Sequence, residues 1–274
     1  MMIAALALAL VVAAAPPSRT AQVRADLTSA RSHFAKSEFE AAIADLTAAL
    51  KIDPKNPATL VDRGAVYDAL GEYDLSLADY DRAAKLRPFW AAAIDNRGNA
   101  YAMRGDYDKS IADHTRALAL DPTYSGGYRN RALTYFLMGR YALAAVDDDR
   151  FLARNPQMRY ARLWVLVAHA RAGTPLPVGS ATKTALAGTR WPQPLLDLYA
   201  GTTTPELATA AATGVGQTCE AAFYVAEWQL GKNDQAQVRD GLTRAVATCP
   251  HSFAEYVVAK VELARLPAPA LQTP

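Results

Sequence analysis

The chain has 274 residues, of which 51% are hydrophobic and 20% are charged, and its 29 basic and 27 acidic side chains leave a formal net charge of +2. This balance argues against a nucleic-acid-binding protein, because basic side chains neither gather in one segment nor alternate with aromatic ones. The length suits one domain or two.

Residues 1–21 are predicted to be a signal peptide. The uncharged segment Ile3–Ala15 is too short to span a bilayer, which needs about 20 residues. Its length is typical of the apolar region of a secretory signal, and Ala13-Ala14-Ala15 offers small residues for cleavage. No cysteine lies nearby for lipid attachment, and no later apolar segment is long enough to span a membrane. Export without a membrane span is therefore expected, and a buried N-terminal helix is the alternative.

The following stretch repeats one unit of 34 residues. Identical residues recur at this spacing in several positions: Pro54, Pro88, Pro122 and Pro156; Gly71, Gly105 and Gly139; Tyr73, Tyr107 and Tyr141. A fixed period of this length is typical of a solenoid. We expect a solenoid over residues 22–172, made of repeats at 23–56, 57–90, 91–124 and 125–158 and a partial repeat at 159–172.

Each unit is expected to be an antiparallel pair of helices. In residues 91–124, Gly105 separates two apolar-periodic segments and fits the left-handed position that closes a helix. Proline at the unit's end lacks the N–H that a continuing helix needs. The pattern resembles the tetratricopeptide repeat (TPR) family, whose motif positions are occupied here by Gly98, Tyr101, Gly105, Tyr107, Ala117 and Pro122. This resemblance implies an all-α solenoid of antiparallel helical hairpins, with a C-terminal helical extension.

The first copy departs from the others. Ser37 replaces the turn glycine, and Phe39 stands where later copies have tyrosine. A terminal repeat is expected to deviate because one of its faces meets solvent instead of a neighbour. The first copy is therefore predicted to cap the solenoid.

Charged residues also recur with the 34-residue period. The series are Arg63, Arg97 and Arg131 on first helices, and Asp45, Asp79, Asp113 and Asp147 on second helices. We expect pairing between or within hairpins, which sets register more than it stabilises when such pairs are exposed. The alternative is an arginine track that grips acidic ligands, and the matching aspartates argue against it.

In the TPR fold the first helices line a concave groove, so the resemblance implies a partner-binding groove. The positions expected to line it are Val61, Asp62, Asp68, Asp95, Asn96, Asn99, Arg129, Asn130, Leu133 and Phe136. Asparagine amides can hold an extended peptide backbone, while Leu133 and Phe136 could form an anchor pocket. The lysine-rich clamp of chaperone-binding TPR domains is disfavoured, because Val61 and Asp95 occupy positions where that clamp needs lysine.

The C-terminal part loses the period. Residues 173–216 are predicted to be an irregular helical connector, in which leucine and tyrosine remain spaced for burial. Residues 217–266 are predicted to form a TPR-like hairpin plus a capping helix, and residues 267–274 are predicted to be a disordered tail. The expected helices are Ala181–Ala187, Pro194–Ala200, Pro205–Ala212 with Thr204 as N-cap, Cys219–Leu230, Gln235–Thr248 and Phe253–Leu266.

Two cysteines bear on the compartment. Cys219 opens the first helix of the C-terminal hairpin and Cys249 closes the second, so an antiparallel hairpin brings them together. In an oxidising compartment we expect a disulfide, whereas two buried free thiols are the alternative. No histidine or acidic cluster sits beside either cysteine at metal-ligand spacing.

The C-terminal hairpin carries a second resemblance, in the segments Cys219–Gly231, Thr248–Pro250 and Glu255–Leu263. With the repeats, it is similar to the NlpI-like branch of bacterial envelope TPR proteins. That resemblance implies a periplasmic, homodimeric adaptor that binds proteases and peptidoglycan hydrolases. The absent lipidation cysteine departs from that branch.

No catalytic motif stands out. The four histidines are scattered, and His114 occupies a second-helix position that normally packs against the first helix, so a structural role is expected. The run Asp147-Asp148-Asp149 is predicted to form a solvated or ion-paired face, because consecutive helical residues point about 100° apart. We therefore predict no enzyme activity, no cofactor and no metal site.

Three functional hypotheses follow. The first is a non-enzymatic periplasmic adaptor for protein or peptide partners such as envelope proteases or peptidoglycan hydrolases, and a homodimer is compatible with it. The second is a self-associating structural module with no separate ligand. The third, an enzyme within Thr174–Gln217, is disfavoured because the only acids there are Asp197 and Glu206.

Overall fold

A computed structural model describes residues 18–175, 190–232, 237–251 and 253–267. Most of the predicted signal peptide (residues 1–17), the short helix predicted at Ala181–Ala187 and residues 268–274 of the predicted tail lie outside the described residues. No helix among the described residues has both the length and the apolar character needed to cross a membrane.

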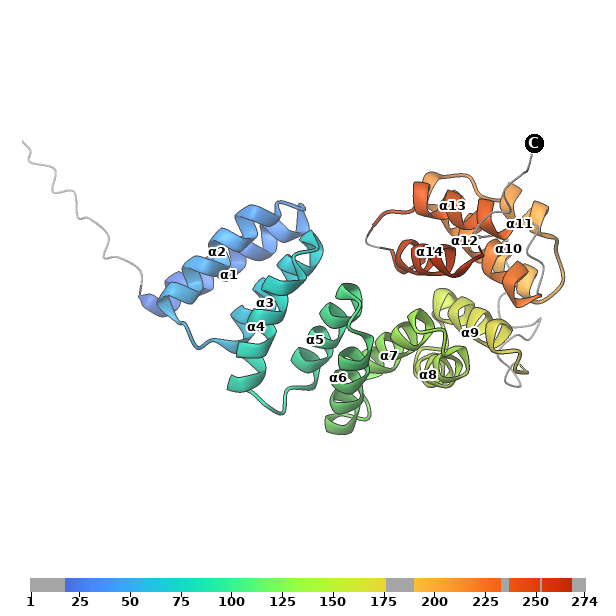
Figure 1. The fold of residues 1–274 in the computed structure, drawn as a ribbon. Coiled ribbons are helices and arrows are strands. Elements are labelled where there is room, and N and C mark those ends of the chain that lie inside the picture. Colours follow the sequence, from blue (N-terminus) through green and yellow to red (C-terminus); the bar gives the residue numbers. More distant parts are fainter. Residues whose placement is uncertain (1–17, 176–189, 233–236, 252, 268–274) are drawn as a thin grey trace, which may run out of the picture.

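The described residues fold into α-helices joined by short connections, which confirms the all-α fold class (Figure 1). In the repeat region the helices are α1 (Arg19–Ala35), α2 (Phe39–Ile52), α3 (Pro57–Leu70), α4 (Tyr73–Leu86), α5 (Ala91–Arg104), α6 (Tyr107–Leu120), α7 (Ser125–Leu137), α8 (Tyr141–Arg154) and α9 (Arg159–Ala172). The C-terminal unit contains α10 (Gln193–Tyr199), α11 (Pro205–Ala210), α12 (Val215–Gly231), α13 (Val238–Thr248) and α14 (Ala254–Arg265).

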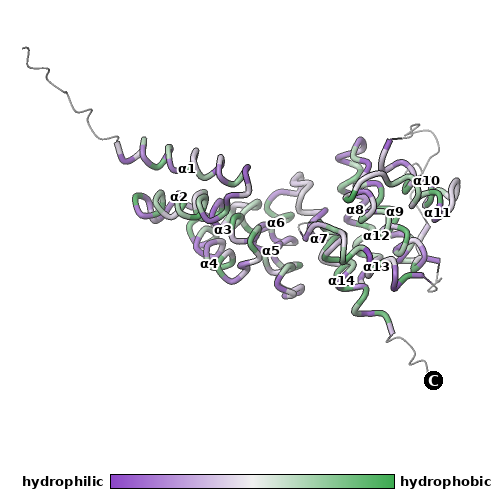
Figure 2. The backbone as a smooth tube through the Cα atoms, turned by 90° about the horizontal axis from the view of Figure 1, so that it is seen from above, coloured by the Kyte–Doolittle hydropathy of each residue, from purple (hydrophilic) through white to green (hydrophobic). Residues whose placement is uncertain are grey.

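The repeat region is a stack of antiparallel hairpins, α1/α2, α3/α4, α5/α6 and α7/α8, with α9 packed on α8. The second helices α4, α6 and α8 begin at Tyr73, Tyr107 and Tyr141, so each starts 34 residues after the one before. Seen from above, the helices follow one another from α1 at one end of the molecule to α10 and α11 at the other (Figure 2). The structure thus confirms a TPR solenoid with additional C-terminal helices.

The turn inside each hairpin needs a left-handed residue. Gly71, Gly105 and Gly139 have φ values of 78°, 93° and 74°, and the next backbone N–H closes the helix, as Glu72 does on the Tyr67 carbonyl. In the first copy Ser37 adopts a φ of 60° in the same place. A side chain in this conformation costs roughly 1–2 kcal/mol, so the first hairpin keeps the turn geometry without the residue that suits it best.

The C-terminal unit folds back onto the last repeats. In Figure 1 it lies beside α7–α9, and α14 contacts α7 while α12 contacts α9. One continuous hydrophobic core joins the two parts, from Ala132 and Phe136 on α7 to Phe223 on α12 and Val258 on α14. Repeats and C-terminal helices therefore make one packed body at this end.

Two predicted features of the C-terminal part are confirmed. Cys219 and Cys249 form a disulfide, which ties the start of α12 to the end of α13. Thr204 caps α11 by accepting a hydrogen bond from the Leu207 backbone N–H at 3.4 Å. The helix predicted at Gln235–Thr248 begins at Val238 in the structure, and the one predicted at Cys219–Leu230 begins earlier, at Val215.

Candidate functional site

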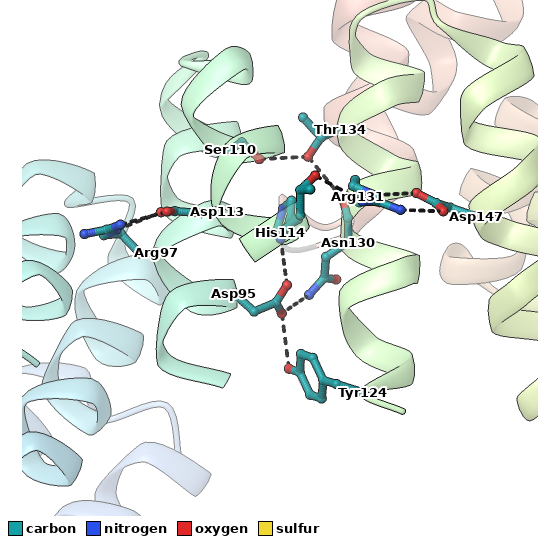
Figure 3. A network of polar contacts seen from close by, with 11 residues as sticks. Asp95, Arg97, Ser110, Asp113, His114, Tyr124, Asn130, Arg131, Thr134 and Asp147 are labelled. Carbon is teal, nitrogen blue, oxygen red and sulfur yellow. Dashed lines mark hydrogen bonds and ion pairs between the residues drawn. The ribbon is translucent and has the colours of Figure 1, made fainter. Parts of the chain in front are cut away.

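The repeated arginines are occupied by aspartates inside the solenoid. Arg63 pairs with Asp79, Arg97 with Asp113 and Arg131 with Asp147, each from the first to the second helix of one hairpin and each through two guanidinium nitrogens. Figure 3 shows the last two pairs. The hydrogen bonds to these carboxylates raise the arginine pKa values. The predicted pairing is confirmed, and these arginines are not an open track for acidic ligands.

Each of these arginines also reaches back to the preceding hairpin. Arg63 donates to the Thr47 hydroxyl at 3.1 Å, and Arg97 donates to the Asp81 carboxylate at 2.7 Å. Arg131 repeats the pattern on Thr115 at 3.0 Å. The series therefore links successive hairpins, which fixes their register.

The residues predicted for the first part of the groove are partly inside the fold. Val61 is buried in the core beside Tyr80. Asp68 accepts a hydrogen bond from the Tyr80 hydroxyl at 2.7 Å, and burial raises its pKa. Asp62 is the more accessible of the two acids and lies 3.9 Å from Arg31. This stretch offers a ligand few free groups.

Asp95 is the centre of a buried polar network (Figure 3). Its two carboxylate oxygens are bonded to His114 Nδ1 at 2.6 Å, to the Asn130 amide at 2.7 Å and to the Tyr124 hydroxyl at 3.1 Å. Both Asp95 and His114 are fully buried. Asp95 and Asn130, which were predicted to face the groove, therefore connect α5, α6 and α7 inside the fold. His114 is a structural histidine, as expected.

The other two groove asparagines, Asn96 and Asn99, are half-buried on α5. Neither makes a side-chain hydrogen bond to another described residue, so both amides remain available. Whether they bind a peptide backbone stays a prediction.

The last three predicted residues, Arg129, Leu133 and Phe136, come together in one pocket. We call it the α7–α14 pocket, because α7, α8, α9, α12 and the start of α14 line it, and its volume is about 360 Å³. Its lining residues are Arg129, Ala132, Leu133, Phe136, Asp148, Phe151, Met158, Tyr160, Ala161, Trp164, Glu220, Phe253, Ala254 and Glu255. Phe136 itself is only 1% exposed and packs edge-on against Tyr141 and Trp164, so it is a wall of the pocket, not an exposed anchor.

Three carboxylates line this pocket. Glu220 accepts hydrogen bonds from the Tyr160 hydroxyl at 2.9 Å and the Trp191 indole N–H at 2.6 Å. Glu255 accepts one from the Tyr224 hydroxyl at 2.8 Å, and burial raises its pKa. Asp148 is 5% exposed, and no hydrogen bond or ion pair joins its carboxylate to another described residue. Burial and the neighbouring Asp147 raise the pKa of Asp148 well above its usual range.

The repeat register explains why the pocket exists. Residue 148 is equivalent to Leu46, Tyr80 and His114, which stand 34 residues apart and are all buried. The rings of Tyr80 and His114 pack so closely on Gly64 and Gly98 that a Cβ there would meet them at 2.7 and 2.8 Å. In the fourth copy the glycine is Ala132 and the ring is replaced by the shorter Asp148. The missing ring leaves space between α7 and α8.

The prediction for the run Asp147–Asp149 was wrong at its middle residue. Asp147 pairs with Arg131, as an ion-paired face requires, and Asp149 lies 3.2 Å from His169 Nε2. Asp148 forms no ion pair with a described residue and is only 5% exposed, because it lies on the inward side of α8 at the ring position, and the charge of Arg129 only partly offsets the rise in its pKa. The 34-residue period could have predicted the burial of Asp148, since it places Asp148 at the position of Tyr80 and His114. The charge of the three consecutive aspartates alone does not reveal it.

The arrangement suits binding better than chemistry. Among the described residues, no group of three or more histidine, cysteine, aspartate or glutamate side chains is placed to hold a metal ion. Among the described histidine–carboxylate pairs, His114–Asp95 is the shortest, at 2.6 Å, but both residues are fully buried, and His114 Nε2 has no hydrogen-bond partner. The α7–α14 pocket, by contrast, is lined by aromatic side chains and by the Asp148 carboxyl group, which has no hydrogen-bond partner among the described residues.

Comparisons with known proteins agree with the repeat architecture. A family described as TPR repeat matches residues 30–71 and 98–139, and a tetratricopeptide repeat family matches residues 58–89. No curated protein matches the sequence.

Similar solved structures are TPR proteins. One is a tetratricopeptide repeat protein from Parabacteroides merdae, with 17% identity, 88% of this chain and 98% of that chain covered, and a TM-score of 0.55. Another is PilF of Pseudomonas aeruginosa, with 16% identity, 90% and 100% coverage, and a TM-score of 0.56. At these identities the similarity concerns the fold.

Proposed function

We propose that this tetratricopeptide repeat protein is a non-enzymatic scaffold that binds a protein partner at the α7–α14 pocket. TPR repeats typically mediate protein–protein interactions. The observation that carries the proposal is the pocket itself, where a buried carboxylate without a partner lies among aromatic walls. Buried polar groups in stable folds nearly always have a hydrogen-bond partner, so an unpartnered carboxyl group in a pocket calls for an explanation.

The finer form of the proposal concerns place and partner. We infer that the chain is exported to the periplasm and recruits envelope proteases or peptidoglycan hydrolases, as its resemblance to NlpI-like adaptors implies. The disulfide between Cys219 and Cys249 supports an oxidising compartment. A homodimer is compatible with this role.

The alternative is a module whose repeats associate with one another and have no separate ligand. Sedimentation of the material captured from native cells separates the two. A self-associating module yields only copies of this chain, whereas a scaffold yields a complex that contains a second protein.

The proposal is tested by photo-crosslinking in the native cells. A photoreactive amino acid replaces Met158, which is 45% exposed at the pocket, or, as a matched control, Leu75, which is 48% exposed on α4. We expect a discrete adduct with an envelope protease or hydrolase at position 158 and none at position 75.

Equal adducts at both positions would place the partner elsewhere on the molecule. Adducts formed only between copies of this chain would support the self-associating module instead. Phe136 is unsuitable as a probe, because its burial means that substitution there disturbs the core.

A further inference from the structure

We propose that the α7–α14 pocket receives a lysine or arginine side chain of the partner polypeptide, with Asp148 as the carboxylate that binds its charged end. This inference rests on the proposed scaffold function and adds the chemistry of the contact.

The charge of the pocket favours a cation. Asp148, Glu220 and Glu255 line it, whereas Arg129 is the one basic residue among the lining residues. Arg129 is exposed and forms no hydrogen bond or salt bridge with Asp148, and its charge only partly offsets the raised pKa values of Asp148 and Glu255. The pocket therefore has more buried acid than nearby base, and a buried carboxylate gains most from a partner that brings both charge and hydrogen bonds.

The walls suit the stem of a basic side chain. Trp164, Phe151 and Phe253 line the pocket, and Leu133 and Met158 add aliphatic surface. Lysine and arginine bury their methylene stems along such surfaces while the charged end finds an anion or an aromatic face. The volume of about 360 Å³ falls within the range of roughly 300–1,000 Å³ typical of ligand pockets.

The third copy shows what the fourth one lacks. There, Asp95 on the first helix and His114 on the second are bonded at 2.6 Å, so an acid and a nitrogen base complete each other. Thirty-four residues later the equivalent positions hold Arg129 and Asp148. The acid and the base have exchanged helices, but Arg129 is exposed at the pocket and makes no hydrogen bond to the buried Asp148. A nitrogen base supplied from outside would restore the missing pair.

Two other occupants compete with this one. Arg129 could turn inward and close the pocket, or it could hold the carboxylate of an acidic peptide. In the first case a ligand must displace Arg129, and in the second case a ligand needs Arg129 for binding. Variants at positions 129 and 148 therefore distinguish these two cases from a bound lysine or arginine.

The experiment measures peptide affinity by calorimetry on the full exported chain. The probes are capped five-residue peptides with alanines around a central lysine, norleucine or glutamate, together with free cadaverine. Norleucine keeps the aliphatic stem of lysine without its ammonium group. We expect the lysine peptide to bind at least tenfold more tightly than the norleucine peptide, and more tightly than cadaverine.

Two variants and one control complete the test. Asp148→Asn should remove the preference for lysine over norleucine. Arg129→Gln should tighten lysine binding several-fold, because it removes a competing cation. Asp108→Asn, at an exposed carboxylate on α6, should leave all affinities unchanged.

Several results would overturn the inference. They are equal binding of lysine and norleucine, tightest binding of the glutamate peptide, cadaverine binding as tightly as the lysine peptide, or an Asp148→Asn variant that still prefers lysine. Crosslinks at position 158 without any lysine preference would leave the scaffold function standing while this inference fails. Lysine binding without a crosslinked partner would support the chemistry of the pocket and contradict the scaffold function.

Discussion

At the scale of single residues, the two helices of a hairpin pack closely where a glycine of the first helix faces a ring of the second. His114 lies against Gly98, where a Cβ would approach ring atoms to 2.8 Å. Without that ring an alanine in a helix would stabilise by about 1 kcal/mol relative to glycine. The contact reverses the sign, because imidazole is held by its bond to Asp95 and cannot retreat.

We therefore predict that Gly98→Ala lowers the free energy of unfolding by about 1–3 kcal/mol, the usual cost of overpacking. The control is Gly216→Ala on α12, where no atom lies within 4 Å of an added Cβ. Urea denaturation of both variants checks this. A Gly98→Ala protein as stable as the control would show that His114 is not fixed in place.

The arginine series gives a second residue-scale prediction. Removing the side chain in Arg97→Ala leaves the buried Asp113 unpaired and breaks the link to Asp81. Losing one member of a buried pair costs about 3–5 kcal/mol, and we expect the lower end because Arg97 is partly accessible. Arg104→Ala, which removes exposed pairs to Asp74 and Asp106, should barely shift the denaturation midpoint. Similar midpoints for the two variants would contradict the structural role of Arg97.

Sequence reasoning succeeded for the charged residues that repeat with the period and failed for several first-helix residues assigned to the groove. The pairing of Arg97 with Asp113 followed from two matching series. The groove assignment assumed that first-helix positions face outward, whereas Asp95 turns into the fold to meet His114, Asn130 and Tyr124. Burial of a polar group depends on partners from other helices, which the spacing of one helix does not reveal.

At the scale of elements, the C-terminal hairpin is the one fastened covalently. Its disulfide joins Cys219 and Cys249, 30 residues apart, and both cysteines are buried. In this hairpin, α12 packs against α9 and α13 packs against α14. Its stability should therefore govern the integrity of the pocket.

We predict that Cys219→Ala/Cys249→Ala lowers the unfolding free energy by roughly 3–4 kcal/mol, the value that the chain-entropy account gives to a loop of this length. Thermal denaturation with and without a reducing agent checks this. The wild-type midpoint should fall on reduction to about that of the variant, and the variant should not respond. A wild-type midpoint indifferent to reduction would contradict the prediction.

The return of α14 onto the repeats could not be predicted from the sequence. It rests on contacts such as the bond from Tyr141 to Glu262 at 2.8 Å, across 121 residues. Neither residue belongs to a series that continues into the C-terminal unit, so no period relates them. Hence the helices of residues 217–266 could be anticipated, but not the surface on which they pack.

At the scale of the whole molecule, a buried charge cluster joins the two parts of the fold. Arg171 on α9 pairs with Glu227 on α12 and with Glu262 on α14, and Arg265 pairs with Glu262 as well. Burial raises the pKa of Glu227 to about 7, although Arg171 opposes the shift. One Glu227 oxygen, Oε1, has no hydrogen-bond partner.

This cluster predicts the pH dependence of stability. The folded protein keeps a proton on Glu227 up to about pH 7, whereas an unfolded glutamate releases it near its ordinary value of 4.5. The stabilisation is therefore complete below pH 4.5 and is lost as the pH rises through 7. Raised pKa values at Asp148 and Glu255 act in the same direction.

We expect the unfolding free energy to be higher at pH 5 than at pH 8, and Glu227→Gln to reduce that difference. The control Glu206→Gln, at an exposed site whose pKa is lowered, should preserve the difference. Urea denaturation at the two pH values measures both. An unfolding free energy that rises with pH in the wild type would show that Glu227 is ionised in the folded state.

The central claim is that the repeats and the C-terminal unit together form a pocket for a basic side chain of a partner. The most direct measurement is the set of nuclear Overhauser effects from the side-chain methylene protons of a bound lysine peptide. We predict contacts to ring protons of Trp164 and Phe151, which line the pocket on α9 and α8. Contacts confined to other parts of the surface, or a lysine side chain without any contact while the peptide is bound, would contradict the claim.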